Sequence, residues 1–173
     1  CWRFKTPSAI VWSLHIPLNL FPDRSRNHEG RMPGWDRTTE REVDVVVDAF
    51  MLVRREAINE VGAYDTGLLL YATEDDFCRR LKDAGWKIYH VPKAKIIHIE
   101  RASTSQVRPL KIDMIYRRDT VRYLRKHHGV WPALIVGAVM AIDLAIAESY
   151  LLARGLLRRL CGGLRVLRSE KSH

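Results

Sequence analysis

Residues 68–81 read LLLYATEDDFCRRL, and this stretch is the most informative part of the sequence. An aliphatic run leads directly into three consecutive carboxylates at 74–76, and apolar residues at helical spacing follow them. Gly85 then predicts the end of a short helix, because glycine readily adopts the backbone conformation found just past a helix. We expect the three carboxylates to form the floor of an active site.

Helix capping offers a simpler explanation for part of this acidic run. Thr73 fits the N-cap position, and Asp76 stands three residues later as the acid of a capping box. Carboxylates in the first turn of a helix are also favoured by its dipole, by ~0.3–1 kcal/mol each. Capping explains one or two acids, but three in a row exceed what it needs. The same dipole favours the ionised form that a general base requires.

The composition is that of a globular protein with an anionic partner. The chain has 173 residues, enough for one domain with a core, and 47% of them are hydrophobic. The net charge of +9 suggests nucleic acid, a phosphate-bearing substrate or an acidic membrane surface, and most of the excess lies from Arg101 onward. Cys1, Cys78 and Cys161 show no metal-binding spacing, which favours a reducing compartment and argues against a disulfide framework.

Hydrophobic patterning predicts an α/β layer in the first part of the chain. The expected elements are a buried strand at 43–53, a helix at 55–61 ended by Gly62, the helix after Thr73, and strands at 86–91 and 95–99. Asp48 interrupts the first strand. A buried carboxylate is costly unless it is paired, so Asp48 either faces a site at a strand end or pairs with Arg54.

The second part of the chain changes character. Residues 108–128 predict a basic helix, and residues 130–153 are long enough to cross a bilayer, which needs ~20 apolar residues. Asp143 and Glu148 interrupt that run, and a central aspartate costs about 2.5–3.5 kcal/mol on insertion. We therefore expect an interfacial helix, or one packed on the domain, with flanking arginines meeting anionic lipid. The alternative is an ordinary amphipathic helix of a soluble domain.

An ordered series of short motifs carries a resemblance to a known family. The motifs are AFMLVRREA at 49–57, EVGAYD at 60–65, LY at 70–71, EDDFCRRL at 74–81, AGWKI at 84–88, VP at 91–92 and His98. On these residues the stretch 43–103 resembles the C-terminal half of family 2 inverting glycosyltransferases with the GT-A fold. It is most similar to the bacterial rhamnosyltransferase-like branch, which builds cell-surface polysaccharides.

The resemblance implies a fold and a catalytic base. Residues 1–107 would form an incomplete GT-A-type, Rossmann-like αβα domain, and residues 108–173 a basic amphipathic helix with an apolar, membrane-associated tail. An acid in the motif would deprotonate the acceptor hydroxyl. Matching the Glu-Asp dipeptide makes Asp75 that base, whereas counting back without gaps from Cys78 makes it Glu74, and Asp75 is slightly preferred. Asp76 is expected to be a cap or to orient Arg80.

Further site residues follow from the same resemblance. The expected substrate-binding residues are Asp48, Tyr71, Asp76, Arg80 and Ser103. Asp48 departs from the small residue that is common at that position in the family. His98 lies where some GT-A enzymes place a histidine that contacts metal or diphosphate, and a divalent cation, Mg²⁺ or Mn²⁺, would offset charge on the leaving group. The alternative for His98 is a histidine at the end of a strand.

The implied reaction transfers a sugar from a nucleotide-sugar donor to a hydroxyl of a lipid-linked or glycan acceptor, and the branch of the family suggests rhamnose as that sugar. It would take place in the cytoplasm, peripheral to the inner (plasma) membrane. Nothing in residues 1–42 resembles the nucleotide-binding half, and no Asp-x-Asp occurs there. We therefore expect the missing N-terminal half of the same enzyme to be a partner of this chain. We also expect this chain alone to bind nucleotide-sugar poorly.

The rival interpretation is a non-catalytic module that binds membrane or nucleic acid through its basic region. Nucleic acid is the weaker partner, because the basic segment carries few aromatic residues beyond Tyr116 and Tyr123. We expect no nucleic-acid partner.

Overall fold

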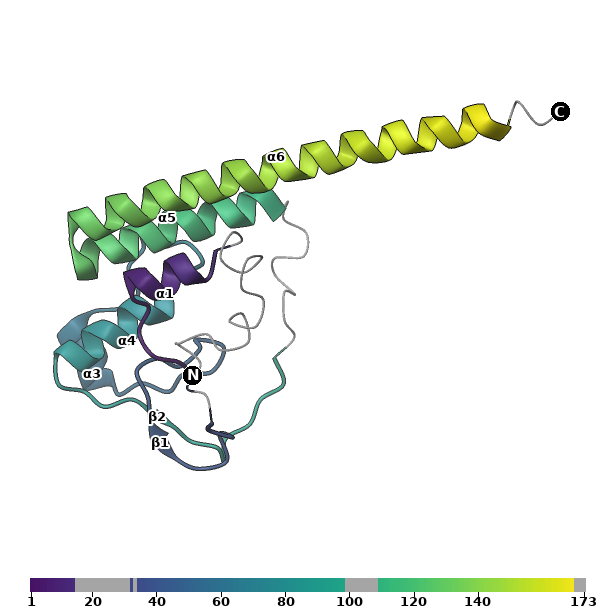
Figure 1. Ribbon diagram of the computed structural model, residues 1–173. Helices are drawn as coiled ribbons and strands as arrows, with labels where there is room; N and C mark the ends of the chain where they lie inside the picture. Colours follow the sequence, from purple (N-terminus) through teal and green to yellow (C-terminus); the bar gives the residue numbers. More distant parts are fainter. Residues whose placement is uncertain (15–31, 33, 99–108, 170–173) are drawn as a thin grey trace.

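The computed structural model describes residues 1–14, 32, 34–98 and 109–169, with side chains up to residue 150 apart from Pro109. Its elements are α1 (Pro7–Trp12), β1 (Arg41–Glu42), α3 (Arg55–Val61), α4 (Thr73–Asp83), β2 (Tyr89–His90), α5 (Pro109–His128) and α6 (Val130–Ser169). Helices α5 and α6 lie side by side as a hairpin above a smaller body that holds α3, α4 and the strands (Figure 1). Helix α6 continues well past the end of α5.

The lower of two hydrophobic clusters forms around α4. Its buried side chains Phe77, Cys78 and Leu81 recur at helical spacing and face one direction, as an amphipathic helix requires. They pack against a set of small and β-branched residues from the flanking segments: Val43, Val45, Ala57 and Ile88. Gly85, with φ of +89°, ends the helix as predicted, and the Trp86 amide donates back to the Leu81 carbonyl.

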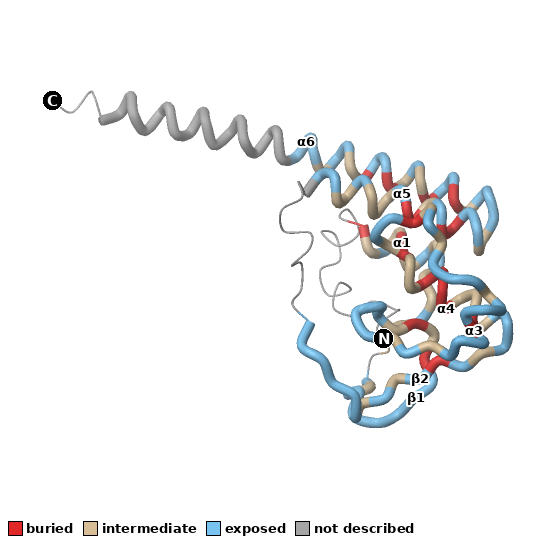
Figure 2. Tube along the Cα trace, turned by 180° about the vertical axis from the view of Figure 1, so that it is seen from behind, coloured by how far each residue is buried: buried red, intermediate tan, exposed pale blue. Residues whose placement is uncertain are grey.

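The upper cluster forms where the hairpin meets α1. Tyr123 and Leu124 of α5 are completely buried against three residues of α6, together with α1 and Ala72. The α6 members are Ala133, Val136 and Met140. Gly129, with φ of +91°, reverses the chain between the two helices, a conformation that glycine adopts without strain. Buried residues accordingly recur along the sides of α5 and α6 that face each other, whereas other positions of α6 are exposed (Figure 2).

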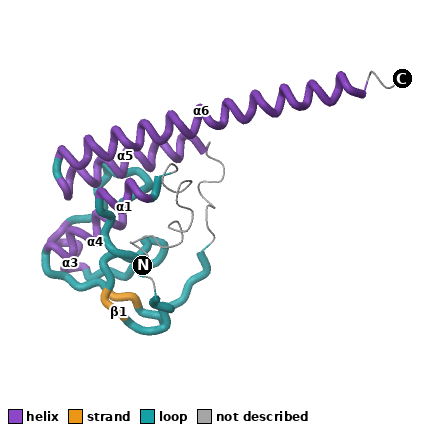
Figure 3. Tube along the Cα trace, in the orientation of Figure 1, coloured by secondary structure: helices purple, strands orange, loops and turns teal. Residues whose placement is uncertain are grey.

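The predicted strands are mostly wrong. Residues 43–53 do not form a strand: Val45 makes one isolated bridge with Trp2, and residues 47–50 are exposed. The sheet among the described residues consists of β1 and β2, antiparallel, with Arg41 opposite His90 and Glu42 opposite Tyr89 (Figure 3). Residues 95–98 are not in a strand either. A strand needs a partner along its length, and these segments have none among the described residues.

The predicted helices at 55–61, 73 onward and 108–128 are confirmed, and Gly62 ends the first with φ of +77°. The capping box is wrong. Ala72, in the left-handed conformation with φ of +59°, occupies the N-cap position, while Thr73 is already helical and donates to Glu74. The expected α/β class is therefore confirmed only in part: the described residues form helices and a two-stranded sheet. The predicted domain boundary at 107 lies outside the described residues.

Candidate active site

The first turn of α4 presents its three acids to different surroundings. Asp75 is fully buried and points toward the N-terminal segment. Its Oδ1 accepts a hydrogen bond of 3.1 Å from the Trp2 indole, and its Oδ2 lies 2.6 Å from the Lys5 ammonium. Burial acts to lower the pKa of Lys5, but the attraction and hydrogen bond of Asp75 raise it. Both carboxylate oxygens of the buried Asp75 are thus engaged within the fold.

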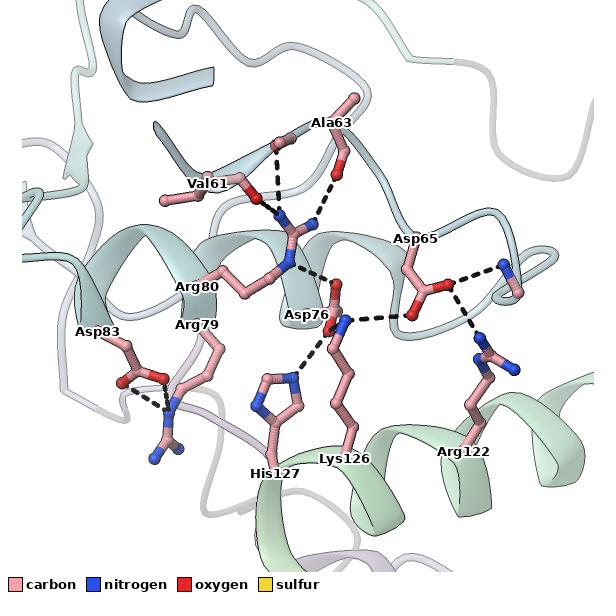
Figure 4. A network of polar contacts seen from close by, with 12 residues as sticks. Val61, Ala63, Asp65, Asp76, Arg79, Arg80, Asp83, Arg122, Lys126 and His127 are labelled. Carbon is pink, nitrogen blue, oxygen red and sulfur yellow. Dashed lines mark hydrogen bonds and ion pairs between the residues drawn. The ribbon is translucent and has the colours of Figure 1, made fainter. Parts of the chain in front are cut away.

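Asp76 is also fully buried, and three basic side chains surround it (Figure 4). Its Oδ1 lies 2.7 Å from the Lys126 ammonium and 2.8 Å from His127 Nε2, while Oδ2 accepts from Arg80 Nε at 2.9 Å. Burial acts to raise the pKa of Asp76, but the hydrogen bonds from His127, Lys126 and Arg80 together hold it well below its usual range. Asp76 therefore stays ionised and joins α4 to α5.

Arg80 uses its remaining donors on the backbone at the end of α3. Its guanidinium donates to the carbonyl oxygens of Val61, Gly62 and Ala63 at 2.5, 3.2 and 2.8 Å (Figure 4). Carbonyls at a helix C-terminus lack partners within the helix, so this contact supplies them. The expected orientation of Arg80 by Asp76 is confirmed. In this geometry both residues serve the fold, and their substrate contacts stay predictions.

Asp65 extends the same network, a role that was not predicted from the sequence. It accepts from the Gly67 amide at 2.8 Å and from Arg122 and Lys126 at 3.1 Å each. The Gly67 hydrogen bond, followed by Lys126, lowers the pKa of Asp65. Lys126 thus bridges Asp65 and Asp76, and the network ties the loop after α3 to the hairpin.

Glu74 differs from both neighbouring aspartates. It is half-buried, and its carboxylate accepts from the Thr73 hydroxyl at 3.0 Å. No lysine or arginine among the described residues lies within ion-pair distance of Glu74. Burial is the largest cause that raises the pKa of Glu74, and the negative charge of Asp75 adds to it. A partly accessible carboxylate with a raised pKa is suited to accept a proton near neutral pH.

Asp48 does not lie in the strand that was expected. It is exposed in a turn, and no ion pair with Arg54 is present in the described part of the chain. Burial raises the pKa of Tyr64, and the charges of Asp48 and Glu74 add to the effect. Tyr64 itself packs on Phe77 with ring centroids 5.0 Å apart. The charges of two predicted site residues therefore act on one tyrosine that the sequence did not single out.

Asp119 holds the loop that leads into α4. Its fully buried Oδ2 accepts hydrogen bonds from three successive amides, those of Leu69, Leu70 and Tyr71, at 3.0, 2.9 and 3.0 Å. Tyr71 also packs edge-on against Tyr116 at 5.2 Å. The sequence carried a signal for this role, because Asp119 lies seven residues after Ile112 and so falls in the apolar stripe of a basic helix.

The expected metal site has no support in the described residues. His98 is exposed, and the described residues contain no group of three or more His, Cys, Asp or Glu side chains that could hold a metal ion. Ser103 lies outside the described residues. A divalent cation at His98 therefore stays a prediction.

A cavity of about 660 Å³ lies on the other side of α4 from this polar network, around Cys78 and Leu81. Its walls are mainly apolar, but Arg54, Lys87 and His90 also line it, and Glu74 and Asp75 do not. Burial raises the pKa of Cys78 to about 11, so its thiol is protonated and unreactive at neutral pH.

Comparison with known proteins supports the motif resemblance. The chain is 29% identical over 155 residues to N-acetylglucosaminyl-diphospho-decaprenol L-rhamnosyltransferase of Mycobacterium tuberculosis, a match that covers 90% of this chain and 50% of the relative. It is 39% identical over 96 residues to Rhamnosyltransferase WbbL of Escherichia coli, covering 56% of this chain and 33% of the relative. No family model and no solved structure matches the chain. The chain spans about half the length of the mycobacterial relatives. The predicted resemblance is therefore confirmed, and the chain is related in sequence to the rhamnosyltransferases among the glycosyltransferases.

Proposed function

We propose that this chain is the part of an inverting, GT-A-type glycosyltransferase that carries the general base, and that Glu74 is this base. One observation carries the assignment. Of the three carboxylates that open α4, Glu74 is partly exposed and its pKa is raised. Asp75 is buried against Lys5 and Trp2, and Asp76 is buried among three basic side chains. This choice reverses the slight preference for Asp75 that followed from matching the Glu-Asp dipeptide.

The proposed reaction is a single displacement. The acceptor hydroxyl gives its proton to the Glu74 carboxylate as its oxygen forms a bond to the anomeric carbon of the donor sugar. The bond from that carbon to the diphosphate breaks on the opposite face, and the nucleoside diphosphate leaves with the electron pair. Attack from one face and departure from the other inverts the anomeric centre.

The names of the relatives indicate the substrate class. The mycobacterial protein is named as a rhamnosyltransferase whose acceptor is an N-acetylglucosaminyl-diphospho-decaprenol. We extend this to the present chain as transfer of rhamnose from a nucleotide-linked donor to a polyprenyl-diphosphate-linked sugar, at the cytoplasmic face of the inner membrane. Nucleotide binding is assigned to another half of the enzyme, in keeping with the share of the relatives that this chain covers. Mg²⁺ or Mn²⁺ stays a proposal for that whole enzyme.

The structure weakens the alternative hypothesis of nucleic-acid binding. Arg118, Arg122 and Lys126 belong to the basic helix, but they contact the Gly67 carbonyl and the Asp65 carboxylate of this chain. Cations that are engaged within the fold are less available to a phosphate backbone. A non-catalytic role remains testable, since it predicts that replacing Glu74 changes nothing.

The test is a transfer assay with the chain expressed together with the coding sequence upstream of Cys1. The substrates are a nucleotide-linked rhamnose and a polyprenyl-diphospho-N-acetylglucosamine. We expect Glu74→Gln to abolish transfer while the protein stays folded. Transfer that survives Glu74→Gln in a folded protein would refute the assignment. For the chain alone, we expect calorimetry to detect no micromolar binding of nucleoside diphosphate.

A further inference from the structure

One face of α6 is apolar and exposed over several turns. It comprises Val130, Trp131, Leu134, Ile135, Ile142 and Ile146, and Tyr150 follows at its far end. Trp131 is 76% exposed and Tyr150 64% exposed, so the aromatic residues at both ends are largely uncovered. The exposed face carries no charged residue between Val130 and Ile146. A helix on the surface of a soluble protein normally turns polar side chains outward, so this face needs a partner.

Of the two acids in the apolar run, Asp143 is turned toward α5, whereas Glu148 is exposed beyond Ile146. Asp143 is fully buried and lies 3.5 Å from the Arg117 guanidinium. Arg117 also donates to the Met140 carbonyl and forms a 2.6 Å ion pair with Asp113 of its own helix. The aspartate that seemed to interrupt an apolar run therefore does not interrupt the exposed face. It fixes which side of α6 is turned inward.

We propose that this face lies in the surface layer of an anionic lipid bilayer, with α6 parallel to the membrane plane. Charge supports lipid over another partner. Lys111 and Arg125 are exposed on α5 and fourteen residues apart, close to four helical turns, so they form one row along the hairpin. Arg118 lies between them, with its guanidinium on the Gly67 carbonyl. Such a row suits the headgroups of acidic lipids, while Trp131 and Tyr150 suit the interface between headgroups and acyl chains.

The packing of the hairpin distinguishes lying on the membrane from crossing it. Residues Val130–Tyr150 have a mean hydropathy of 2.1 and are long and apolar enough to span a bilayer, and 22% of the segment is buried within the fold. However, α5 lies alongside and carries Asp113, Arg117 and Arg118 at that level. If α6 crossed the bilayer with this packing intact, those charges would enter the hydrocarbon, which is unfavourable. An in-plane hairpin keeps them at the headgroup level or inside the fold.

This orientation deepens the proposed function, since a membrane-bound enzyme meets a lipid-linked acceptor directly. Helix α5 would connect the two regions, because Asp119 of the same helix holds the loop that precedes Glu74. The lipid contact can nevertheless be measured without any transfer reaction. Failure of one proposal is thus distinguishable from failure of the other.

The first experiment is flotation of the full chain with vesicles of phosphatidylcholine, with and without phosphatidylglycerol. We expect binding to the mixed vesicles and much weaker binding to pure phosphatidylcholine. The double variant Ile135→Gln/Ile142→Gln should bind at least ~10-fold more weakly, since it removes two apolar side chains from the contact. The matched control is Leu52→Gln, which alters an equally apolar side chain, 96% exposed, away from the hairpin. It should bind as the unmodified chain does.

The second experiment measures depth. Trp131 and Ile142 lie on the same face of α6, eleven residues apart, a separation of ~16 Å along the axis. Quenching by brominated lipids gives the depth of Trp131 in the unmodified chain and the depth of position 142 in the variant Trp131→Phe/Ile142→Trp. We expect the two depths to be equal. The variant Trp131→Phe supplies the background fluorescence of the other tryptophans. Depths that differ by most of that separation would show a spanning helix and overturn the in-plane orientation.

Three further results would overturn the lipid assignment. They are no flotation with mixed vesicles, flotation unchanged by Ile135→Gln/Ile142→Gln, and a soluble dimer that this double variant dissociates. The last result would show that a second copy of the chain covers the face.

Discussion

Two carboxylates at the start of α4, two residues apart, lie in opposite electrostatic surroundings. Asp76 is enclosed by Arg80, Lys126 and His127, and its pKa is lowered. Glu74 is partly exposed, and its pKa is raised. Both share the same helix and the same dipole, so proximity to a helix N-terminus does not decide their chemistry. Burial and the charge of Asp75 raise the pKa of Glu74, whereas hydrogen bonds from neighbouring cations lower that of Asp76.

The surroundings of Asp76 and of Glu74 therefore have different roles. The network around Asp76 joins α4 to the end of α3 and to α5, and so holds the lower cluster against the hairpin. Glu74, in the same turn, is a partly exposed carboxylate. A single acidic run therefore contains both a structural part and a chemical part, and variants at each position separate them.

The largest expected effect is on catalysis at Glu74. Glu74→Gln keeps the size of the side chain but removes the proton acceptor, so kcat in the transfer assay should fall by about 10²–10⁴-fold. The matched control is Asp83→Asn, which removes an exposed carboxylate from the other end of α4. A kcat within twofold of the unmodified enzyme for Glu74→Gln would place the base elsewhere.

Next in size is the loss of stability at Asp76. Asp76→Asn leaves three basic groups without their buried counter-charge, which should lower the free energy of unfolding by about 3 kcal/mol. This is the lower end of the range for a broken buried pair, because Lys126 is partly exposed. Urea unfolding at neutral pH would measure it, with Asp83→Asn expected to cost at most ~0.5 kcal/mol.

The pH dependence of Asp76 gives a second readout of the same variant. Because the pKa of Asp76 is lower in the folded state, its contribution to stability is present above the ordinary pKa of an aspartate. That contribution is lost as the pH falls further toward the folded-state value. The stability difference between Asp76→Asn and the unmodified chain should therefore shrink in acid, and a difference that grows there would contradict the assigned ion pairs.

A smaller effect is expected at Asp119. Asp119→Asn weakens the acceptor for the amides of Leu69, Leu70 and Tyr71, which should cost about 1–3 kcal/mol in thermal or urea unfolding. If this loop positions Glu74, kcat should also fall while the pH profile keeps its shape. Unchanged amide hydrogen exchange at residues 69–71 in the variant would show that Asp119 does not hold the loop.

The smallest expected effect is a gain in stability in Glu74→Gln. The pKa of Glu74 is raised on folding, so its ionised form opposes folding at neutral pH. The neutral variant should therefore melt slightly higher at pH 7. The gain should disappear as the pH falls below the ordinary pKa of a glutamate, where the side chain is protonated in both states. A variant that melts lower at pH 7 would show that the Glu74 charge is stabilised instead.

Local sequence patterns predicted the helices and their ends well. Helical spacing of apolar residues placed α3, α4 and α5, and Gly62 and Gly85 marked where the first two end. These features depend on residues within a few positions of one another, so a local pattern is sufficient to predict them. The order of short motifs also indicated the kinship with rhamnosyltransferases.

The strands and the roles within the acidic run were decided by tertiary structure. The β-branched run at 43–53 lacks strand partners along its length among the described residues, and no local pattern reports that. Asp75 is closed by Lys5, 70 residues away in the sequence, and Asp76 by His127, 51 residues away. Sequence determined that three carboxylates would stand together at the start of a helix. Only the packing of distant cations decided that Asp75 and Asp76 are neutralised and Glu74 is left open, because burial and charge act through space rather than along the chain.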